Sequence, residues 1–117
     1  MKLGAIYLRD QCLVPRVWNA VSAWERTRGL LGRPKLLPGE GMLINDCRLV
    51  HTLGMGYALD LAFLDRSGQV RKLVSGLNPL RIAGSLPASA TLELAPGTLA
   101  GIGLQQGDRL TWREALS

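Results

Sequence analysis

This sequence is poor in the residues that most often build a metal centre or a catalytic site. Its 117 residues include one histidine, His51, and two cysteines, Cys12 and Cys47. Neither cysteine belongs to a C-x-x-C pair, which argues against a zinc knuckle or a thioredoxin-type redox centre. Because no export signal is recognisable, we expect both thiols to be free.

Long apolar runs are also missing. No window approaches the roughly 18 uncharged apolar residues that a membrane-spanning helix needs. The apolar start of the chain is interrupted by Arg9 and Asp10 and is too short for a secretory signal. There are no repeats and no linker-like stretch. The sequence therefore predicts one soluble, cytoplasmic domain over residues 1–117 that makes no contact with a membrane.

Charge is unevenly distributed. Residues 1–35 carry seven basic and two acidic side chains, whereas the rest of the chain is balanced, and the formal net charge is +5. A basic segment attracts anions and, in some proteins, nucleic acid. No aromatic RNA-binding signature, helix-turn-helix or zinc finger accompanies it. We therefore interpret it as a solvated surface and do not expect nucleic acid as a partner.

Short β-rich runs dominate the remainder. They predict about seven strands, at Leu3–Leu8, Cys12–Trp18, Met42–Ile44, Tyr57–Leu64, Gln69–Val74, Ala90–Ala95 and Arg109–Arg113. Pro15 indicates an edge position or a bulge, because proline cannot donate a ladder hydrogen bond. The segment Asp65–Gly68 is typical of a hairpin turn.

Two short helices complete the prediction. Ser22 and Glu25 fit a capping box that opens a helix ending near Gly32, and a second helix runs from Thr98 to near Gly103. The segment Ser75–Ser89 is rich in Gly, Pro and Ser and indicates a long loop, a common place for binding. The fold class is therefore mainly β (α+β by strict count), a β-sandwich or open barrel.

The predicted strand Tyr57–Leu64 is apolar on both faces, so it should be central and covered on both sides. Asp60 is the anomaly within it. A buried carboxylate needs a partner, and we expect Arg28 or Arg33 to supply one. Glu93, which alternates with leucines on a shorter strand, is expected to face water.

The role of the segment around His51 can be interpreted in more than one way. His51 is either a general base or a structural imidazole. Cys47 and His51 form C-x3-H, but four residues of a strand span about 13 Å, too far for one zinc ion to bridge. Cys47, His51 and Asp60 could form a nucleophilic constellation if the fold brings them together. We predict no metal site and no cofactor.

Several motifs in a fixed order resemble a bacterial and archaeal family, the domain of unknown function 192. They cover residues 22–110 and comprise E-R-T-R-G-L-L-G-R (25–33), G-M-L (41–43), H-T-L-G-M (51–55), L-D-L-A-F-L-D (59–65), L-E-L-A-P-G (92–97) and G-D (107–108). Many members have Trp-Met-Lys-Asn-Thr where this chain has His51–Met55, so the chain resembles a His-Thr variant. The resemblance implies a mostly-β domain and no particular reaction.

These observations favour a ligand-binding or accessory interaction module. The predicted pocket is lined by Arg28, Cys47, His51, Thr52, Met55 and Asp60. Arg28 would face a small anionic ligand, and a protein partner is the other option. The alternative is a small hydrolase or transferase that uses Cys47 or His51. In a third reading the polar cluster only braces helix against sheet. The sequence leaves the catalytic residues and the oligomeric state open.

Overall fold

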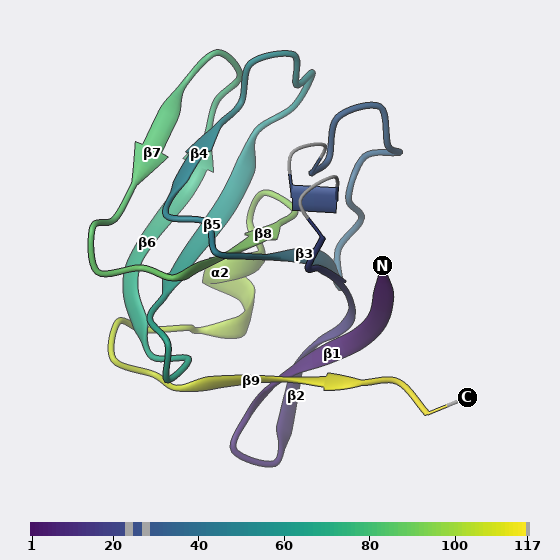
Figure 1. Ribbon diagram of the computed structural model, residues 1–117, viewed down its shortest axis with the longest axis vertical. Helices are drawn as coiled ribbons and strands as arrows, with labels where there is room; N and C mark the ends of the chain where they lie inside the picture. Colours follow the sequence, from purple (N-terminus) through teal and green to yellow (C-terminus); the bar gives the residue numbers. More distant parts are fainter. Residues whose placement is uncertain (23–24, 27–28, 117) are drawn as a thin grey trace.

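The computed structural model describes residues 1–22, 25–26 and 29–116 and is mostly β (Figure 1). A short helix, α2 (Thr98–Ile102), accompanies the strands. The strands are β1 (Lys2–Leu8), β2 (Gln11–Ala20), β3 (Glu40–Asn45), β4 (Leu49–His51), β5 (Leu59–Leu64), β6 (Val70–Leu77), β7 (Ile82–Gly84), β8 (Ala90–Leu94) and β9 (Leu110–Glu114). The predicted mainly-β class is confirmed, and each of the seven predicted strands overlaps an observed one.

Seven of the strands form one sheet in the order β6-β5-β8-β3-β2-β1-β9. Neighbouring strands are antiparallel except for β2 and β3, which are parallel. The sheet curls until its two ends meet at a bridge between Gln69 and Arg109, but it does not close into a barrel. In Figure 1, β5 and β6 therefore stand steeply while β9 runs across the bottom.

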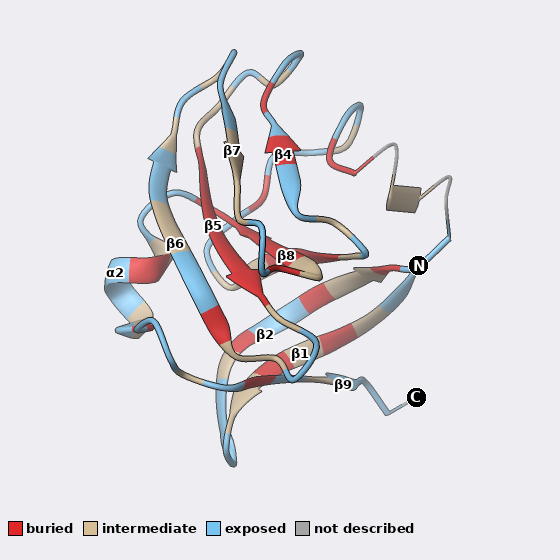
Figure 2. Cartoon of the chain, turned by 60° about the vertical axis from the view of Figure 1, so that its left-hand side comes forward, coloured by how far each residue is buried: buried red, intermediate tan, exposed pale blue. Residues whose placement is uncertain are grey.

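The core is built around β5, in which all six residues are buried (Figure 2). Alternate side chains of a strand point to opposite faces. Ala62 and Leu64 accordingly join the cluster inside the curl of the sheet, whereas Leu59, Leu61 and Phe63 join a second cluster on its other face. The prediction that this strand is covered on both sides is confirmed, although β5 is the second strand from one end of the sheet and not its centre.

The turn between β5 and β6 also agrees with the prediction. Asp65 Oδ1 accepts hydrogen bonds from the backbone N–H groups of Ser67 (2.9 Å) and Gln69 (3.0 Å). The side-chain hydroxyl of Ser67 donates to the same oxygen, and these hydrogen bonds hold the pKa of the Asp65 carboxyl below its usual value. The hairpin register is thus fixed by one side chain.

Pro15 lies in β2, an inner strand between β1 and β3, and the register of the β1–β2 pair shifts beside it, so the predicted alternative of a bulge is confirmed. One detail of the prediction was wrong. The predicted loop Ser75–Ser89 contains the end of β6 and all of β7, which pairs with β4 as a separate two-stranded sheet. The strands β4 and β7 have only three residues each, and β7 lies within a segment rich in glycine and proline, so no sequence pattern indicates them as strands.

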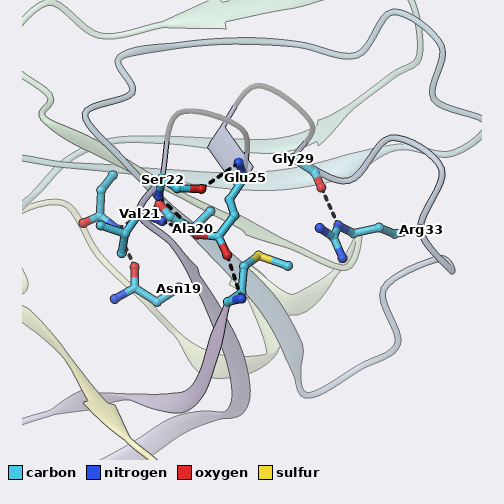
Figure 3. Close-up of polar contacts among 9 residues, drawn as sticks. Asn19, Ala20, Val21, Ser22, Glu25, Gly29 and Arg33 are labelled. Atoms are coloured by element: carbon cyan, nitrogen blue, oxygen red, sulfur yellow. Dashed lines mark hydrogen bonds and ion pairs between the residues drawn. The ribbon is translucent and has the colours of Figure 1, made fainter.

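The capping box is present as predicted (Figure 3). Glu25 N–H donates to Ser22 Oγ (3.1 Å), and Ser22 N–H donates back to Glu25 Oε1 (3.1 Å). The Met1 ammonium lies 2.6 Å from Glu25 Oε2, and this contact lowers the pKa of Glu25 to about 2. The rest of the predicted first helix falls partly on residues 23–24 and 27–28, outside the described residues.

The predicted second helix is α2, and Gly103 with φ 65° ends it. Of the helical segments in the described part of the chain, none has the length and apolarity needed to cross a membrane.

Asp60 is buried, and its hydrogen-bond partners in the described part of the chain are backbone N–H groups and not Arg33. Its two carboxylate oxygens accept hydrogen bonds from the backbone N–H groups of Gly76 (2.8 Å) and Leu99 (2.9 Å). Arg33 instead donates to the Gly29 carbonyl (2.8 Å; Figure 3), and Arg28 lies outside the described residues. Asp60 therefore joins β5 to β6 and α2.

Replacing Asp60 by asparagine should weaken this junction. The amide keeps the size of the side chain, but its NH2 group would face a backbone N–H that now donates to the carboxylate. We expect Asp60→Asn to lower the free energy of unfolding by about 2–3 kcal/mol, measured by urea denaturation. Asp10→Asn, at a fully exposed position, is the control and should leave it unchanged; equal stability of the two variants would contradict this role.

The meeting point of β6 and β9 can be tested with two glycines. Gly68 and Gly107 both have positive φ, but a Cβ added at Gly68 would lie 2.3 Å from the Leu110 carbonyl oxygen, whereas one at Gly107 meets nothing within 4 Å. Both alanine variants bear the left-handed strain of about 1–2 kcal/mol. Thermal unfolding should show Gly68→Ala less stable than Gly107→Ala by a further 1–3 kcal/mol or so. Equal melting temperatures would mean that the contact does not constrain the fold.

Candidate functional site

A small cleft lies where the segment after the capping box, the end of β3, the chain from residue 47 to His51, and β8 come together. Its volume is about 100 Å³. We call it the Glu93 cleft; its lining residues are Arg26, Gly29, Leu30, Leu31, Ile44, Cys47, Leu49, Val50, His51, Met55 and Glu93. Most of these side chains are apolar, so the few polar groups define the chemistry of the cleft.

The structure brings together three of the six residues that the sequence suggested for a pocket. Cys47, His51 and Met55 all line the Glu93 cleft. Thr52 is fully buried beside it, where its hydroxyl donates to the Asn78 carbonyl (2.7 Å) and accepts from the Arg81 N–H (2.9 Å). Thr52 thus joins two loop segments.

The remaining two predicted residues do not contribute described atoms to the cleft. Asp60 pairs with Leu94 of β8, and its side chain therefore lies on the face of the sheet opposite to Glu93. Arg28 is outside the described residues, so its predicted role as an anion-binding residue stays a prediction.

Glu93 is the polar residue that the sequence prediction missed. It pairs with Met42 on one neighbouring strand and Leu61 on the other, so its side chain shares their face of the sheet. Only 5% of Glu93 is exposed, and burial raises the pKa of its carboxyl to about 7. The expectation that Glu93 faces water was wrong because β8 is an inner strand covered on both faces.

Gly29 leaves space for this carboxyl. Its φ is +51°, and a Cβ added there would lie 4.0 Å from Glu93 Oε1 and 3.6 Å from Ile44 Cδ1. The negative charge of Glu93 is also felt by Tyr57, whose phenol pKa is raised by burial and, to a smaller extent, by that charge. A carboxyl with a pKa near neutrality can both accept and donate a hydrogen bond at physiological pH.

Cys47 and His51 line the same cleft but differ in environment. The thiol of Cys47 is half-buried and donates to the Leu49 carbonyl oxygen at 3.3 Å. His51 is exposed on β4, where it pairs with Ile82 of β7. Activation of a thiol by imidazole needs a hydrogen bond between the two, and the thiol proton is instead used by a carbonyl.

Both cysteines are free, as predicted. Within residues 1–22, 25–26 and 29–116, no three His, Cys, Asp or Glu side chains gather closely enough to hold a metal ion.

Exposed aliphatic side chains lie on or next to the segments that line the cleft. Val50 of β4 points into the core, so its neighbours Leu49 and His51 point outward, with Leu49 63% exposed. Ile82, paired with His51, is also 63% exposed. The side chain of Leu31 lies close to the chain beside Leu53: its Cδ2 is 3.2 Å from the position that a Cβ on Gly54 would take. We call the set Leu31, Leu49, Leu53 and Ile82 the aliphatic rim.

Comparison with known proteins identifies relatives of the whole chain. A family model described as DUF192, "Uncharacterized ACR", matches residues 6–112. A protein of unknown function from Novosphingobium aromaticivorans DSM 12444 superimposes with a TM-score of 0.78 at 23% identity, covering 94% of this chain and 84% of that one. A Sinorhizobium meliloti 1021 protein, provisionally named a transcription regulator, also has a TM-score of 0.78, at 26% identity over 95% of this chain and 92% of that one. The chain matches no curated protein sequence.

The raised pKa of Glu93 predicts a distinct pH dependence of stability. The ordinary value of 4.5 applies in the unfolded chain and about 7 in the folded one, so the folded state holds the proton more tightly. Stability should therefore fall as pH rises from 4.5 to about 7. Glu93→Gln removes this dependence. The free energy of unfolding of the variant should therefore exceed that of the wild type by up to about 3 kcal/mol at pH 8, but not below pH 4.5. Urea denaturation from pH 4 to 8 tests this; a difference that does not vary with pH would refute the assignment.

Proposed function

The chain belongs to the domain of unknown function 192 family, and from its site we propose that it is an interaction module that binds a polypeptide partner at the Glu93 cleft. The partner lays apolar side chains on the aliphatic rim and inserts one side chain into the cleft. The observation that carries this proposal is a buried carboxyl that lines a small cleft, with exposed leucine and isoleucine on and next to the segments that form the cleft.

The size of the cleft favours a single inserted side chain. Sites for small molecules and cofactors usually enclose about 300–1,000 Å³. The Glu93 cleft offers about 100 Å³, the space of roughly three water molecules. A ligand of ordinary metabolite size would therefore leave most of its surface outside, whereas one side chain of a larger partner fits.

The aliphatic rim supplies the surface on which the rest of the partner would pack. Leu49 and Ile82 are each 63% exposed and Leu53 is 50% exposed. Single exposed leucines are ordinary, but several large aliphatic side chains next to a cleft are typical of an interaction surface. Apolar contact of this kind contributes about 25 cal/mol for each Å² removed from water.

The chemistry of Glu93 restricts the inserted group. Both the ionised and the protonated carboxyl keep an oxygen that accepts a hydrogen bond. The matching group on the partner is therefore a donor, such as an amide, a hydroxyl or an ammonium group. Arg26 lines the same cleft but is already paired with Asp46 at 3.0 Å, so it is less available to an anion.

Two other functions of this site have less support from the structure. A small anionic ligand would depend on Arg28, which lies outside the described residues. A hydrolase or transferase would need the Cys47 thiol to be activated, and that thiol donates to the Leu49 carbonyl. Both remain predictions of the sequence, and neither has a further observation in its favour.

A selection of peptides tests the proposed surface. Peptides would be selected from a random library on the immobilised protein, and the affinity of the best would be measured by calorimetry. We expect the double variant Leu49→Glu with Ile82→Glu to bind them at least about tenfold more weakly, because charge is placed where apolar contact is needed. Glu93→Leu should also weaken binding, since the inserted donor loses its acceptor.

Leu86→Glu is the matched control, because Leu86 is 86% exposed and lines no part of the Glu93 cleft. It should bind the peptides like the wild type. The imidazole NMR signal of His51, the one histidine in the chain, should shift when a selected peptide is added. Peptides that bind the rim double variant and the wild type equally, with no change at His51, would rule out this surface.

A further inference from the structure

A second and larger depression lies on the other side of the segment that forms one wall of the Glu93 cleft. It has a volume of about 500 Å³, and its walls are the chain after β3, the β5–β6 turn and the loop before β8. The lining residues are Asp46, Arg48, Asp65, Arg66, Ser67, Leu86, Pro87, Ala88 and Ser89. We call it the arginine cleft. Its size is that of an ordinary small-molecule site.

Hydrogen bonds hold the walls of the arginine cleft in place. Ser89 N–H donates to the Leu64 carbonyl (2.7 Å), and Cys47 N–H donates to the Ser89 carbonyl (3.1 Å). Ser85 N–H donates to the Arg48 carbonyl (3.0 Å). The third wall is the turn that Asp65 fixes through its own hydrogen bonds. The depression is therefore formed in advance of any ligand.

Of the charged side chains that line this depression, the carboxylates are in ion pairs and the arginines are not. The Asp46 carboxylate is paired with Arg26 at 3.0 Å, and the Asp65 carboxylate with Arg71 at 3.4 Å. Arg48 and Arg66 have no ion pair with any residue in the described part of the chain. Two guanidinium groups are thus left to face a ligand, each with a planar set of donors suited to a carboxylate or a phosphate.

The depression continues into an apolar region at the open end of the curled sheet. A neighbouring concavity of about 490 Å³ shares five of its residues and adds the apolar side chains Ile6, Leu43, Leu64, Leu110 and Trp112. Trp112 is fixed there, because its indole N–H donates to the Val17 carbonyl at 2.9 Å. Mouths of curled β-sheets are frequent ligand sites, and here a charged end adjoins an apolar end.

We propose that the arginine cleft binds a small organic anion, whose phosphate or carboxylate group is held by Arg48 and Arg66 while its apolar or aromatic body rests toward Trp112. This site does not depend on the Glu93 cleft. The two clefts share no lining residue, and this one takes an anion whereas the Glu93 cleft takes a hydrogen-bond donor.

Two probes separate the possible anionic groups: phenyl phosphate and benzoate, each titrated into the ¹⁵N-labelled full chain at low salt. We expect saturable shifts of the backbone amides of residues 46–48, 65–67 and 88–89 and of the Trp112 indole. The probe with the lower Kd identifies the preferred group. Inorganic phosphate, which lacks the apolar body, should bind more weakly, and raising the salt concentration should weaken all three.

The variants Arg48→Ala and Arg66→Ala should each raise the Kd about threefold to tenfold, since both arginines are exposed and only partly desolvated on binding. Arg81→Ala removes an exposed arginine that lines neither cleft and is the control for net charge. It should leave the Kd unchanged. Failure of both probes to give saturable shifts, or an equal loss of affinity in Arg81→Ala, would overturn the proposal.

Discussion

The burial of β5 on both faces is the constraint on which the rest of the structure depends. A strand with six buried residues needs apolar cover on two sides, and no single flat sheet provides it. The seven-stranded sheet curls to cover one face, while β4, β7 and the segments around them cover the other. The Glu93 cleft is lined partly by Leu30, Ile44 and Val50 of the second cluster, and the concavity beside the arginine cleft by Ile6, Leu43 and Leu64 of the first.

Because both faces of the sheet are buried, polar side chains on neighbouring strands lie in different buried environments. Asp60 on β5 and Glu93 on β8 are both almost completely buried, but on opposite faces. Asp60 has both oxygens occupied by backbone N–H groups and therefore acts as a structural junction. Glu93 lines an apolar cleft, and burial raises the pKa of its carboxyl to about 7, so it can take up or release a proton near neutral pH.

Much of this fold was predictable because its signals are local. The capping box of Ser22 and Glu25, the Asp65 turn and the two apolar faces of β5 each follow from a pattern within a few residues. Glu93 was misjudged because its burial depends on β8 lying between β5 and β3, a fact of sheet order that alternation on one strand does not contain. The β4–β7 pair was missed because three-residue strands gain their stability from partners distant in sequence.

The chain from residue 46 to residue 49 separates the two clefts in a simple alternation. Asp46 and Arg48 line the arginine cleft, and Cys47 and Leu49 line the Glu93 cleft. Gain or loss of a single residue here would disrupt this alternation and alter the lining of both clefts at once.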